Sequence, residues 1–268
     1  MYKEFSLKNK NIVITGAGGI IGQKLSQALL NTGANVALID INEKALINLK
    51  NNLTKQEDNF FEIYKIDVTK EKEVNKIIGN INKRFGSIDV LHNNAATKTN
   101  SIDDFLKPFE DYKLSTWDDV MSGNLSSMFL MSKAVGKFMT KQKYGSIIQT
   151  ASIYGVVTPD KDMYEGSKYN GLQISTPASY SVSKSGVIAL TKYLAAYWAK
   201  YNIRVNTISP GGIFSGQNSE FVKKYNKKVP LGRMCSEQDI VGAIIFLSSD
   251  ASSYITGQNI IIDGGFTL

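Results

Sequence analysis

The chain has 268 residues, 43% of them hydrophobic and 21% charged, which is enough for one large globular domain with a sizeable core. The formal net charge of +7 is spread along the whole length, and only Lys223–Lys228 is clustered, so we expect a solvated basic face there and no nucleic-acid partner. No apolar run approaches the ~20 residues of a membrane span, the leader 1–10 lacks the apolar core of a secretory signal, and the lone Cys235 agrees with a cytoplasmic location.

Short β-branched runs alternate with longer stretches of helical period along the chain. The expected strands are 11–15, 35–40, 61–67, 88–94, 145–152, 203–209 and 259–264. The expected helices lie near 20–32, 43–56, 71–85, 116–141, 179–200 and 236–248. Several strands are apolar at nearly every position, as in sheets covered on both faces. We therefore predict an α/β fold, a single Rossmann-type domain over 1–268 whose doubly wound parallel sheet has about seven strands and helices on both faces.

Glycines are dense where the first expected strand meets the first expected helix, in the stretch TGAGGIIG. Gly16 allows a tight turn, Gly18 lets backbone N–H groups approach a pyrophosphate, and Gly22 lets the helix pack close to the strand. The positive end of that helix faces the diphosphate charge. The sequence therefore predicts a dinucleotide site with contacts from Gly16, Gly18, Ile20, Ile21 and Gly22.

Asp40 ends the second expected strand 18 residues beyond Gly22. An acidic residue ~20 residues after the glycines typically bonds the ribose 2′-hydroxyl of NAD. A carboxylate there repels the 2′-phosphate of NADP, and the residues that follow, INE, offer no arginine to receive one. We therefore predict NAD as the cofactor, in preference to NADP.

The stretch SYSVSK places Tyr180 and Lys184 four residues apart, on one face of a helix. A phenol with a pKa of about 10 is a poor base at neutral pH. A nearby ammonium group, together with the positive charge of oxidised nicotinamide, favours the phenolate and lowers that pKa. Alone, such a pair is usually just part of a helix surface. Beside a dinucleotide site it indicates an acid/base centre.

The chain resembles the short-chain dehydrogenase/reductase family, in its group of about 250 residues, from Leu7 to Gly265. The matching stretches, in order, are TGAGGIIG, DVT, NNAA, GNL, TASIYG, YSVSK, RVNTISPGG and ITGQNIIIDGG. The resemblance implies an NAD(P)-dependent oxidoreductase that moves a hydride between the cofactor and a carbinol or carbonyl carbon. It also implies a homo-dimer or homo-tetramer, because the helices corresponding to 126–139 and 181–199 pair across subunits in relatives.

The resemblance further implies roles for individual residues. Tyr180 would be the general acid/base, and Lys184 would lower its pKa while binding the nicotinamide ribose. Ser152 would hydrogen-bond the substrate oxygen, and Asn124 would hold the water of a proton relay. Beyond the glycine turn and Asp40, the implied cofactor contacts are Asp67, Val68, Asn93, Ala95, Tyr180, Lys184, Pro210, Gly211, Ile213 and Ser215. We expect no metal site, and we expect the only histidine, His92, to be packed in its apolar strand.

One departure concerns the glycine spacing. Gly16, Gly19 and Gly22 have the three-residue spacing of the family's extended group, which includes nucleotide-sugar epimerases and dehydratases, whereas Ile20 stands where the shorter group has glycine. Members of the extended group carry a separate C-terminal substrate domain. Only 84 residues follow Lys184, which leaves no room for such a domain, so the shorter group is favoured.

A second departure is the stretch of 27 residues between Ser152 and Tyr180, which is much longer than usual in the family. The segment 153–178 is rich in charged residues and carries Tyr154, Tyr164 and Tyr169. Because both of its ends border the reacting carbon, we expect it to form a lid over a sugar or polyol; otherwise its charges face solvent and only its tyrosines pack inward. Relatives with such insertions resemble dehydrogenases of surface-glycan and flagellin-modification pathways.

Three other functions stay open at this point. The protein could be a 3-oxoacyl or other carbonyl reductase of the same family. It could be a sugar-modifying lyase or epimerase that recycles NAD internally. It could also be a non-enzymatic NAD-binding module, against which the presence of all four implied catalytic positions argues. The sequence does not identify the substrate, the direction of the reaction or the pathway.

Overall fold

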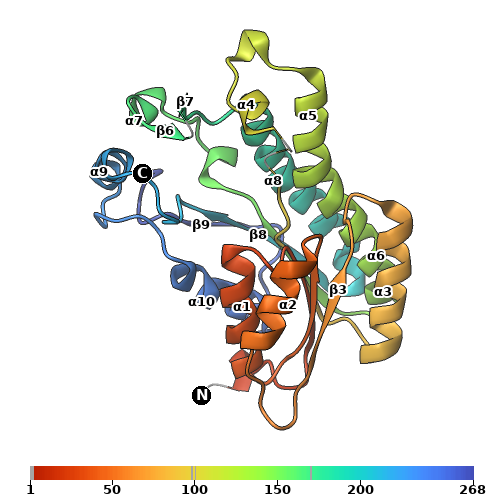
Figure 1. The fold of residues 1–268 in the computed structure, drawn as a ribbon. Helices are drawn as coiled ribbons and strands as arrows, with labels where there is room; N and C mark the ends of the chain where they lie inside the picture. The colour runs from red at the N-terminus through yellow and green to blue at the C-terminus, as the bar shows by residue number, and fades with distance from the viewer. Residues whose placement is uncertain (1–2, 98, 100, 170) are drawn as a thin grey trace.

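A parallel sheet lies at the centre of the computed structural model, which describes residues 3–97, 99, 101–169 and 171–268. Within these residues the sheet has seven strands in the order β3-β2-β1-β4-β5-β8-β9 (Figure 1). The strands are β1 (Asn11–Thr15), β2 (Asn35–Asp40), β3 (Phe61–Lys65), β4 (Val90–Asn93), β5 (Gly145–Thr150), β8 (Ile203–Pro210) and β9 (Asn259–Ile262). Every pairing is parallel, so the carboxyl ends of the strands share one edge.

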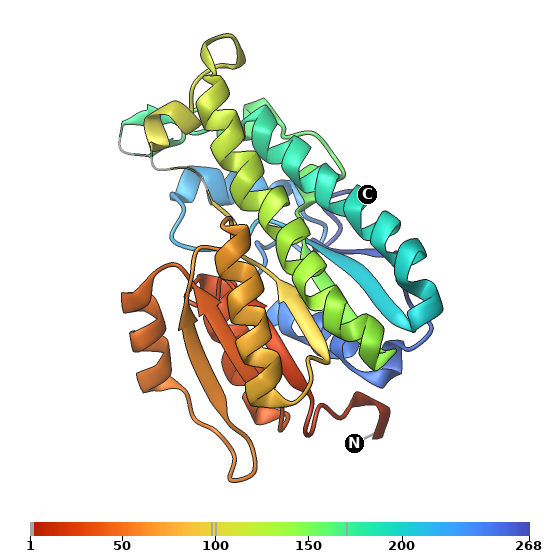
Figure 2. The same ribbon diagram turned by 90° about the vertical axis from the view of Figure 1, so that its right-hand side faces the viewer.

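Helices cover both faces of the sheet, as Figures 1 and 2 show. One face packs against α1 (Ile20–Asn31), α2 (Glu43–Asn52) and α10 (Glu237–Ser248). The other packs against α3 (Glu71–Phe85), α6 (Ser127–Gln142) and α8 (Ala178–Trp198). Alternate residues of β1 divide the two cores, because Ile12 and Ile14 join the first and Val13 joins the second. The predicted single-domain, doubly wound α/β fold is confirmed.

The single helix expected at 116–141 is interrupted. Helix α5 (Leu114–Met121) passes into a π-helical turn, Ser122–Ser126, before α6 begins. This turn contains Gly123, and an ideal Cβ on that glycine would lie 2.2 Å from Cγ2 of Thr97. The helix is therefore pressed against the loop that follows β4. Single π-turns inside helices are frequent at functional sites.

The two long segments between expected elements contain structure of their own. Helix α4 (Ile102–Phe105) lies within 97–115, of which residues 98 and 100 are outside the described part of the chain. Helix α7 (Lys161–Tyr164) and the hairpin of β6 (Lys168–Tyr169) and β7 (Leu172–Gln173) lie within 153–178. Short 3₁₀ turns stand at Lys3–Phe5, Phe109–Asp111, Ile153–Gly155, Ala199–Tyr201 and Asp250–Ser252.

Helix α9 (Ser219–Lys228) is absent from the predicted elements. Its run of lysines resembles a solvated surface, and Lys223, Lys227 and Lys228 are indeed exposed. Phe221 and Tyr225, however, are buried against α7, which lies beside α9 (Figure 1). In the part of the chain that the structure describes, no helix is both long and apolar enough to cross a membrane.

Candidate functional site

The turn after β1 passes beneath α1 with almost no room for side chains. Gly16 has a φ of +67°, and an ideal Cβ on it would lie 2.9 Å from Cα of Ala95. A Cβ on Gly22 would lie 2.2 Å from the carbonyl oxygen of Gly16. Helix α1 begins without a side-chain cap and without an acidic residue in its first turn. Its first N–H groups are therefore available to bind an anion.

Asp40 stands at the end of β2 with its carboxylate held by the backbone. Its Oδ2 accepts a hydrogen bond from the N–H of Gly18 at 2.9 Å, and its Oδ1 accepts one from the N–H of Asn42 at 2.9 Å. The oxygen atoms are thus fixed beside the glycine turn. They can accept a hydrogen bond from a sugar hydroxyl there and would repel a phosphate.

A cleft of about 920 Å³ follows the carboxyl ends of the strands and gathers most of the predicted cofactor residues. Ten of them line it: Gly16, Gly18, Ile20, Ile21, Asp40, Asp67, Val68, Ala95, Ile213 and Ser215. Among the described residues that line the cleft, which do not include Lys98, Lys70 is the only basic one. The wall includes several neighbours that sequence reasoning missed: Ile41, Asn42, Ala45, Thr69 and Asn94. The glycine turn, the free helix N-terminus and the placement of Asp40 fit a dinucleotide.

Asn93, which the family resemblance places by the cofactor ribose, does not line the cleft. Its side chain is buried and donates hydrogen bonds to Oγ of Ser132 and to Oε1 of Gln149, both at 3.0 Å. Asn94 lines the cleft instead. Neighbouring residues at the end of a strand point in opposite directions, and the sequence does not show which asparagine of the pair faces the cofactor.

Five further predicted residues also lie off the wall: Tyr180 and Lys184, which are described below, and Gly22, Pro210 and Gly211. Gly22 is packed beneath the glycine turn, where its missing side chain lets α1 approach. Pro210 ends β8, and the N–H of Gly211 donates to the carbonyl of Ile262 at 2.9 Å. These residues shape the cleft from behind, while Ile213 and Ser215 reach its surface.

Helix α8 carries Tyr180 and Lys184 one turn apart, next to the end of β5. Nζ of Lys184 lies 5.8 Å from the centroid of the Tyr180 ring and donates to the carbonyl oxygen of Thr150 at 2.9 Å. Ser152 follows β5, and its Oγ accepts a hydrogen bond from the N–H of Tyr154 at 3.2 Å. The structure therefore brings the predicted tyrosine, lysine and serine together.

Burial shifts the pKa values of Lys184 and Tyr180. The side chain of Lys184 is 2% exposed, and burial lowers its pKa to about 8. Burial raises the pKa of Tyr180, a hydrogen bond with the Ser152 hydroxyl lowers it in part, and the nearby Tyr164 raises it. Desolvation of the phenolate thus outweighs the other effects in the protein alone. The expectation that Lys184, together with the positive charge of bound nicotinamide, favours the phenolate stays a prediction.

Asn124 occupies the π-helical turn and is completely buried. Its Oδ1 accepts a hydrogen bond from the N–H of Thr97 at 2.8 Å, and its Nδ2 donates to Oγ of Ser183 at 3.3 Å. The side chain thus joins the loop after β4 to helix α8. The preceding residue, Gly123, lines the cleft, so this turn connects the cleft to the helix that carries Tyr180.

His92 is packed as expected. Its side chain is fully buried, with Nε2 at 2.9 Å from Oγ1 of Thr150, and burial lowers its pKa to about 3. The imidazole is therefore neutral at physiological pH.

The inserted segment 153–178 packs on α9, and we call these two pieces together the roof. Met163 and Tyr164 of the segment are buried with Phe221 and Tyr225 of α9. The C-terminal tail adds Phe266, whose ring stacks on Tyr225 with centroids 5.0 Å apart. The apolar cluster that holds the two pieces of the roof together is therefore completed by a third segment, far from both in the sequence.

Two lysines of α9 hold the roof from outside. Nζ of Lys224 donates to the carbonyl oxygens of Asp162 and Glu165, at 3.2 Å and 2.7 Å, and Lys228 forms an ion pair with Asp160. The charges of the segment thus face solvent or α9, while Tyr164 packs inward. The side chain of Tyr169 lies outside the described part of the structure.

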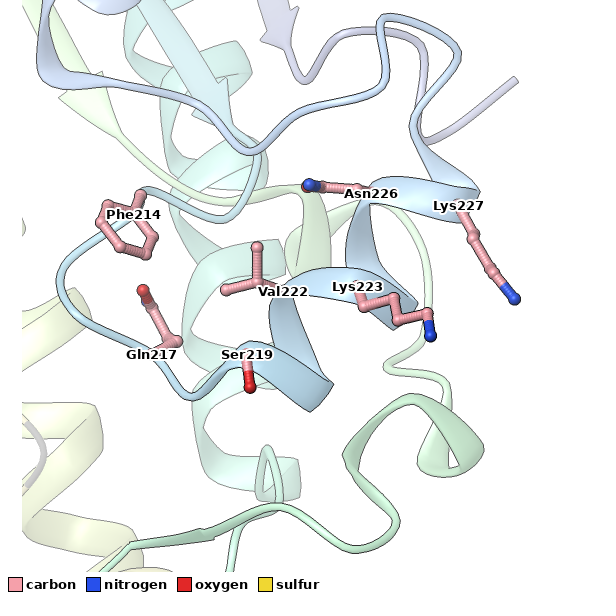
Figure 3. Close-up of a pocket in the computed structure, with 7 residues that line it drawn as sticks. All are labelled: Phe214, Gln217, Ser219, Val222, Lys223, Asn226 and Lys227. Atoms are coloured by element: carbon pink, nitrogen blue, oxygen red, sulfur yellow. The ribbon is translucent and has the colours of Figure 1, made fainter.

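Figure 3 shows a second hollow, of about 680 Å³, along α9. Phe214 and Gln217 lie at one end of it, and Lys223 and Lys227 lie at the other. Phe214 belongs to the loop after β8, whose residues Ile213 and Ser215 line the cofactor cleft. This loop therefore borders both hollows.

Comparison with known proteins agrees with this geometry. Residues 10–226 match the family described as short chain dehydrogenase. The chain is 33% identical to an NAD-dependent glycerol dehydrogenase of Listeria innocua, covering 99% of this chain and 97% of the relative. It is 35% identical to an NADP-dependent mannitol dehydrogenase of Hypocrea jecorina, with 98% and 94% covered. It is 31% identical to post-translational flagellin modification protein A of Campylobacter coli, with 98% and 100% covered.

A solved structure extends the similarity to the fold. The short chain dehydrogenase of Leptospira borgpetersenii with bound NAD+ is 35% identical and superposes with a TM-score of 0.85, covering 100% of this chain and 96% of that one. The match spans the glycine turn, the tyrosine–lysine helix and the roof. The chain therefore belongs to the short-chain dehydrogenase/reductase family.

Proposed function

We propose that this protein is an NAD-dependent oxidoreductase that transfers a hydride between NAD(H) and a carbinol or carbonyl carbon of a polyol or sugar. One observation carries the proposal. A cleft suited to a dinucleotide ends at the π-helical turn, beside the helix on which Tyr180 and Lys184 face Ser152. An acid/base pair at the end of a nucleotide cleft is the arrangement that hydride transfer to or from a carbinol needs.

Different residues of the cleft would hold different parts of the nucleotide. The uncapped N-terminus of α1, which the turn at Gly16 and Gly18 leads into, would hold the diphosphate with its first backbone N–H groups. Asp40 would accept from the ribose 2′-hydroxyl, which favours NAD over NADP because a 2′-phosphate would meet a carboxylate. Asp67 and Val68 would border the adenine, and the stretch ending in Ile213 and Ser215 would contact the nicotinamide amide. When bound, NAD supplies the hydride acceptor or donor.

Side chains of the protein itself would carry out the proton transfer. In oxidation, the Tyr180 oxygen would take the proton of the substrate hydroxyl, while the Ser152 hydroxyl would donate a hydrogen bond to the same oxygen. Because burial raises the pKa of Tyr180, the phenolate requires positive charge, which the Lys184 ammonium would supply from one turn away. Asn124 would hold a water that links this group to solvent.

Several further properties belong to the same proposal. The segment 153–178 would act as a lid over the substrate, and the single domain would extend over 1–268. The chain would form a homo-dimer or homo-tetramer through α6 and α8, where Phe129, Tyr193 and Tyr197 are 47%, 65% and 60% exposed. Cytoplasmic location agrees with the lone cysteine, Cys235.

Polyol oxidation is the reaction that tests the proposal. Purified protein is incubated with glycerol, xylitol or mannitol and with NAD or NADP, and reduced cofactor is followed by absorbance. We expect NADH to form with at least one polyol. Tyr180→Phe should reduce kcat by at least about 100-fold while leaving NAD binding unchanged, because general acid/base catalysis contributes about 10² to 10⁴. Tyr254→Phe, at a fully exposed tyrosine, is the matched control.

Three results would contradict the proposal. Product that forms from a sugar without accumulation of reduced cofactor would indicate a lyase or epimerase that recycles NAD internally. Full activity in Tyr180→Phe would remove the acid/base assignment. Turnover of a 3-oxoacyl thioester in preference to every sugar and polyol would identify a carbonyl reductase.

A further inference from the structure

Three hydroxyl groups of the inserted segment 153–178 form a hydrogen-bonded series. The hydroxyl of Tyr164 donates to the hydroxyl of Tyr154 at 2.8 Å, and it also lies 2.8 Å from Oγ1 of Thr176. Tyr164 comes from α7, and Thr176 comes from the end of the inserted segment. Tyr154 comes from the 3₁₀ turn directly after Ser152. The insertion therefore brings two hydroxyls to a tyrosine near the catalytic serine.

The single hydrogen on each hydroxyl fixes the direction of donation along this hydrogen-bonded series. Each hydroxyl has one hydrogen to donate. The hydrogen of Tyr164 goes to Tyr154, so the contact with Thr176 must be donated by Thr176. Donation thus runs from Thr176 through Tyr164 to Tyr154. Within the described residues, the hydroxyl hydrogen of Tyr154 has no acceptor in place. Hydrogen bonds in such a series strengthen one another, so the free hydrogen of Tyr154 is a strengthened donor.

Tyr154, the last member of this hydrogen-bonded series, lies close to Ser152 and Tyr180. The main-chain N–H of Tyr154 donates to Oγ of Ser152, and Tyr154 is near enough to Tyr180 for the charge of one to influence the pKa of the other. Burial and the contact with Tyr164 raise the pKa of Tyr154 far above its ordinary value. The group therefore keeps its hydrogen at every physiological pH.

Packing holds the two tyrosines of the hydrogen-bonded series in place. Tyr164 is 8% exposed, and its ring lies 5.4 Å from that of Phe221 in α9. The ring of Tyr154 packs on the same apolar cluster. A donor held by packing and by two other hydroxyls loses little conformational entropy when it binds a ligand oxygen, which favours selectivity.

We propose that Tyr154 determines substrate specificity by donating its hydroxyl hydrogen to a second oxygen of the substrate, near the carbon that reacts. The proposal rests on the function proposed above and deepens it, because it names the feature that the site selects: a carbinol with a neighbouring hydroxyl, as in a polyol, over a simple secondary alcohol. Tyr164 and Thr176 act as positioning residues for this donor. A site built to hydrogen-bond a substrate hydroxyl discriminates strongly against an analogue that lacks it.

Tyr154→Phe tests the proposal, because it removes the donor and keeps the ring. Steady-state kinetics with NAD compare the best polyol with butane-2,3-diol and butan-2-ol, which differ from each other by one hydroxyl. We expect kcat/KM for the polyol and the diol to fall about tenfold more than that for butan-2-ol, since one hydrogen bond is worth about that factor. If butan-2-ol turns over too slowly to follow, competitive inhibition constants replace its rates. Tyr164→Phe should give a smaller change in the same ratio.

The controls separate this proposal from the one on which it rests. Tyr254→Phe should leave all rates unchanged. NAD binding should be the same in Tyr154→Phe as in the wild type, and its thermal stability should fall by no more than the loss of one hydrogen bond, about 1 kcal/mol. A wild-type protein that oxidises no polyol overturns both proposals. A wild type that oxidises polyols, with Tyr154→Phe retaining the wild-type ratio, overturns only this one. An equal loss on the diol and on butan-2-ol also overturns it, because Tyr154 would then act through Ser152.

Discussion

The proposed cofactor side and the proposed substrate side of this molecule are built from different kinds of structure. The cofactor cleft consists of backbone turns, a helix N-terminus and small residues, with Asp40 as its principal specific side chain. The roof consists of large side chains, Met163, Tyr164, Phe221 and Tyr225 among them, from segments that meet only in the folded chain. A site made of backbone recognises what all members of the family share, whereas a site made of side chains can vary its ligand.

This difference predicts how substitutions affect the structure of each side. On the cofactor side an added methyl group meets backbone atoms that cannot move, so damage is steric and severe. On the roof, a lost side chain leaves a cavity that its neighbours partly fill, so damage is local and graded. The following experiments break or sharpen this contrast.

The largest effect is expected from Gly22→Ala. The new Cβ would lie 2.2 Å from the carbonyl oxygen of Gly16 and 2.7 Å from Cα of Ala17, so α1 must shift away from the turn. We expect a loss of about 3 kcal/mol in the free energy of unfolding and at least about a tenfold rise in the Kd for NAD. Denaturant unfolding and calorimetric titration measure the two quantities.

Gly79→Ala is the matched control for that substitution. Gly79 lies within α3, and its added Cβ would meet no atom within 4 Å. Alanine should stabilise the helix by up to about 1 kcal/mol and leave NAD binding unchanged. Equal behaviour of the two variants would show that the glycine turn is not crowded.

Met163→Ala should open the roof without affecting the cofactor side. Met163 is 2% exposed in the apolar cluster, and truncation of such a side chain costs about 2 to 3 kcal/mol. Hydrogen exchange should speed up in α7 and α9 and remain unchanged in β1 and β2. Lys161→Ala, at an exposed position of the same short helix, should have no effect. Exchange that rises equally in both regions would contradict their independence.

Asp40→Ala tests the one specific side chain of the cofactor side. The variant loses an acceptor for the ribose and the repulsion of a 2′-phosphate, so kcat/KM with NAD should fall about tenfold and the preference over NADP should narrow. Lys70, which lines the same cleft, would then attract the additional phosphate of NADP without an opposing carboxylate at position 40. Asp58→Ala, at an exposed aspartate, serves as the control. An unchanged preference would assign cofactor choice to another residue.

The smallest effect concerns Lys184, where the two sides meet. Its pKa is about 8 in the folded protein and 10.5 in the unfolded chain, so between these values the unfolded state binds more protons and stability rises with pH. The free energy of unfolding should therefore increase by about 1 to 2 kcal/mol between pH 7 and 9.5 in the wild type. Lys184→Met should lack this increase, and Lys192→Met, at an exposed site on the same helix, should retain it.

The sequence predicts the cofactor side well because its determinants are local. The bounds of β1 and β2 coincide with the predicted ranges, and the glycines and Asp40 lie within one strand–turn–helix–strand unit. Asn93 is the exception, since the choice between it and Asn94 depends on which way the chain turns after β4.

The roof could not be predicted from the sequence, because its determinants are not local. Helix α9 has only two buried side chains, Phe221 and Tyr225, and its lysines resemble a surface run. The partners of these two side chains in α7, Met163 and Tyr164, lie 57 to 62 residues earlier, and no local pattern reveals that pairing. The raised pKa of Tyr180 is equally invisible in the spacing of Tyr180 and Lys184, because it arises from burial by the tertiary fold.

The stacking of Phe266 on Tyr225 has a consequence for how sequence changes combine. Phe266, Tyr225 and Tyr164 belong to segments far apart in the sequence, yet they share one apolar cluster. A substitution in any one of these segments would therefore disturb the packing of the other two. The three segments must be compared together when related sequences are aligned.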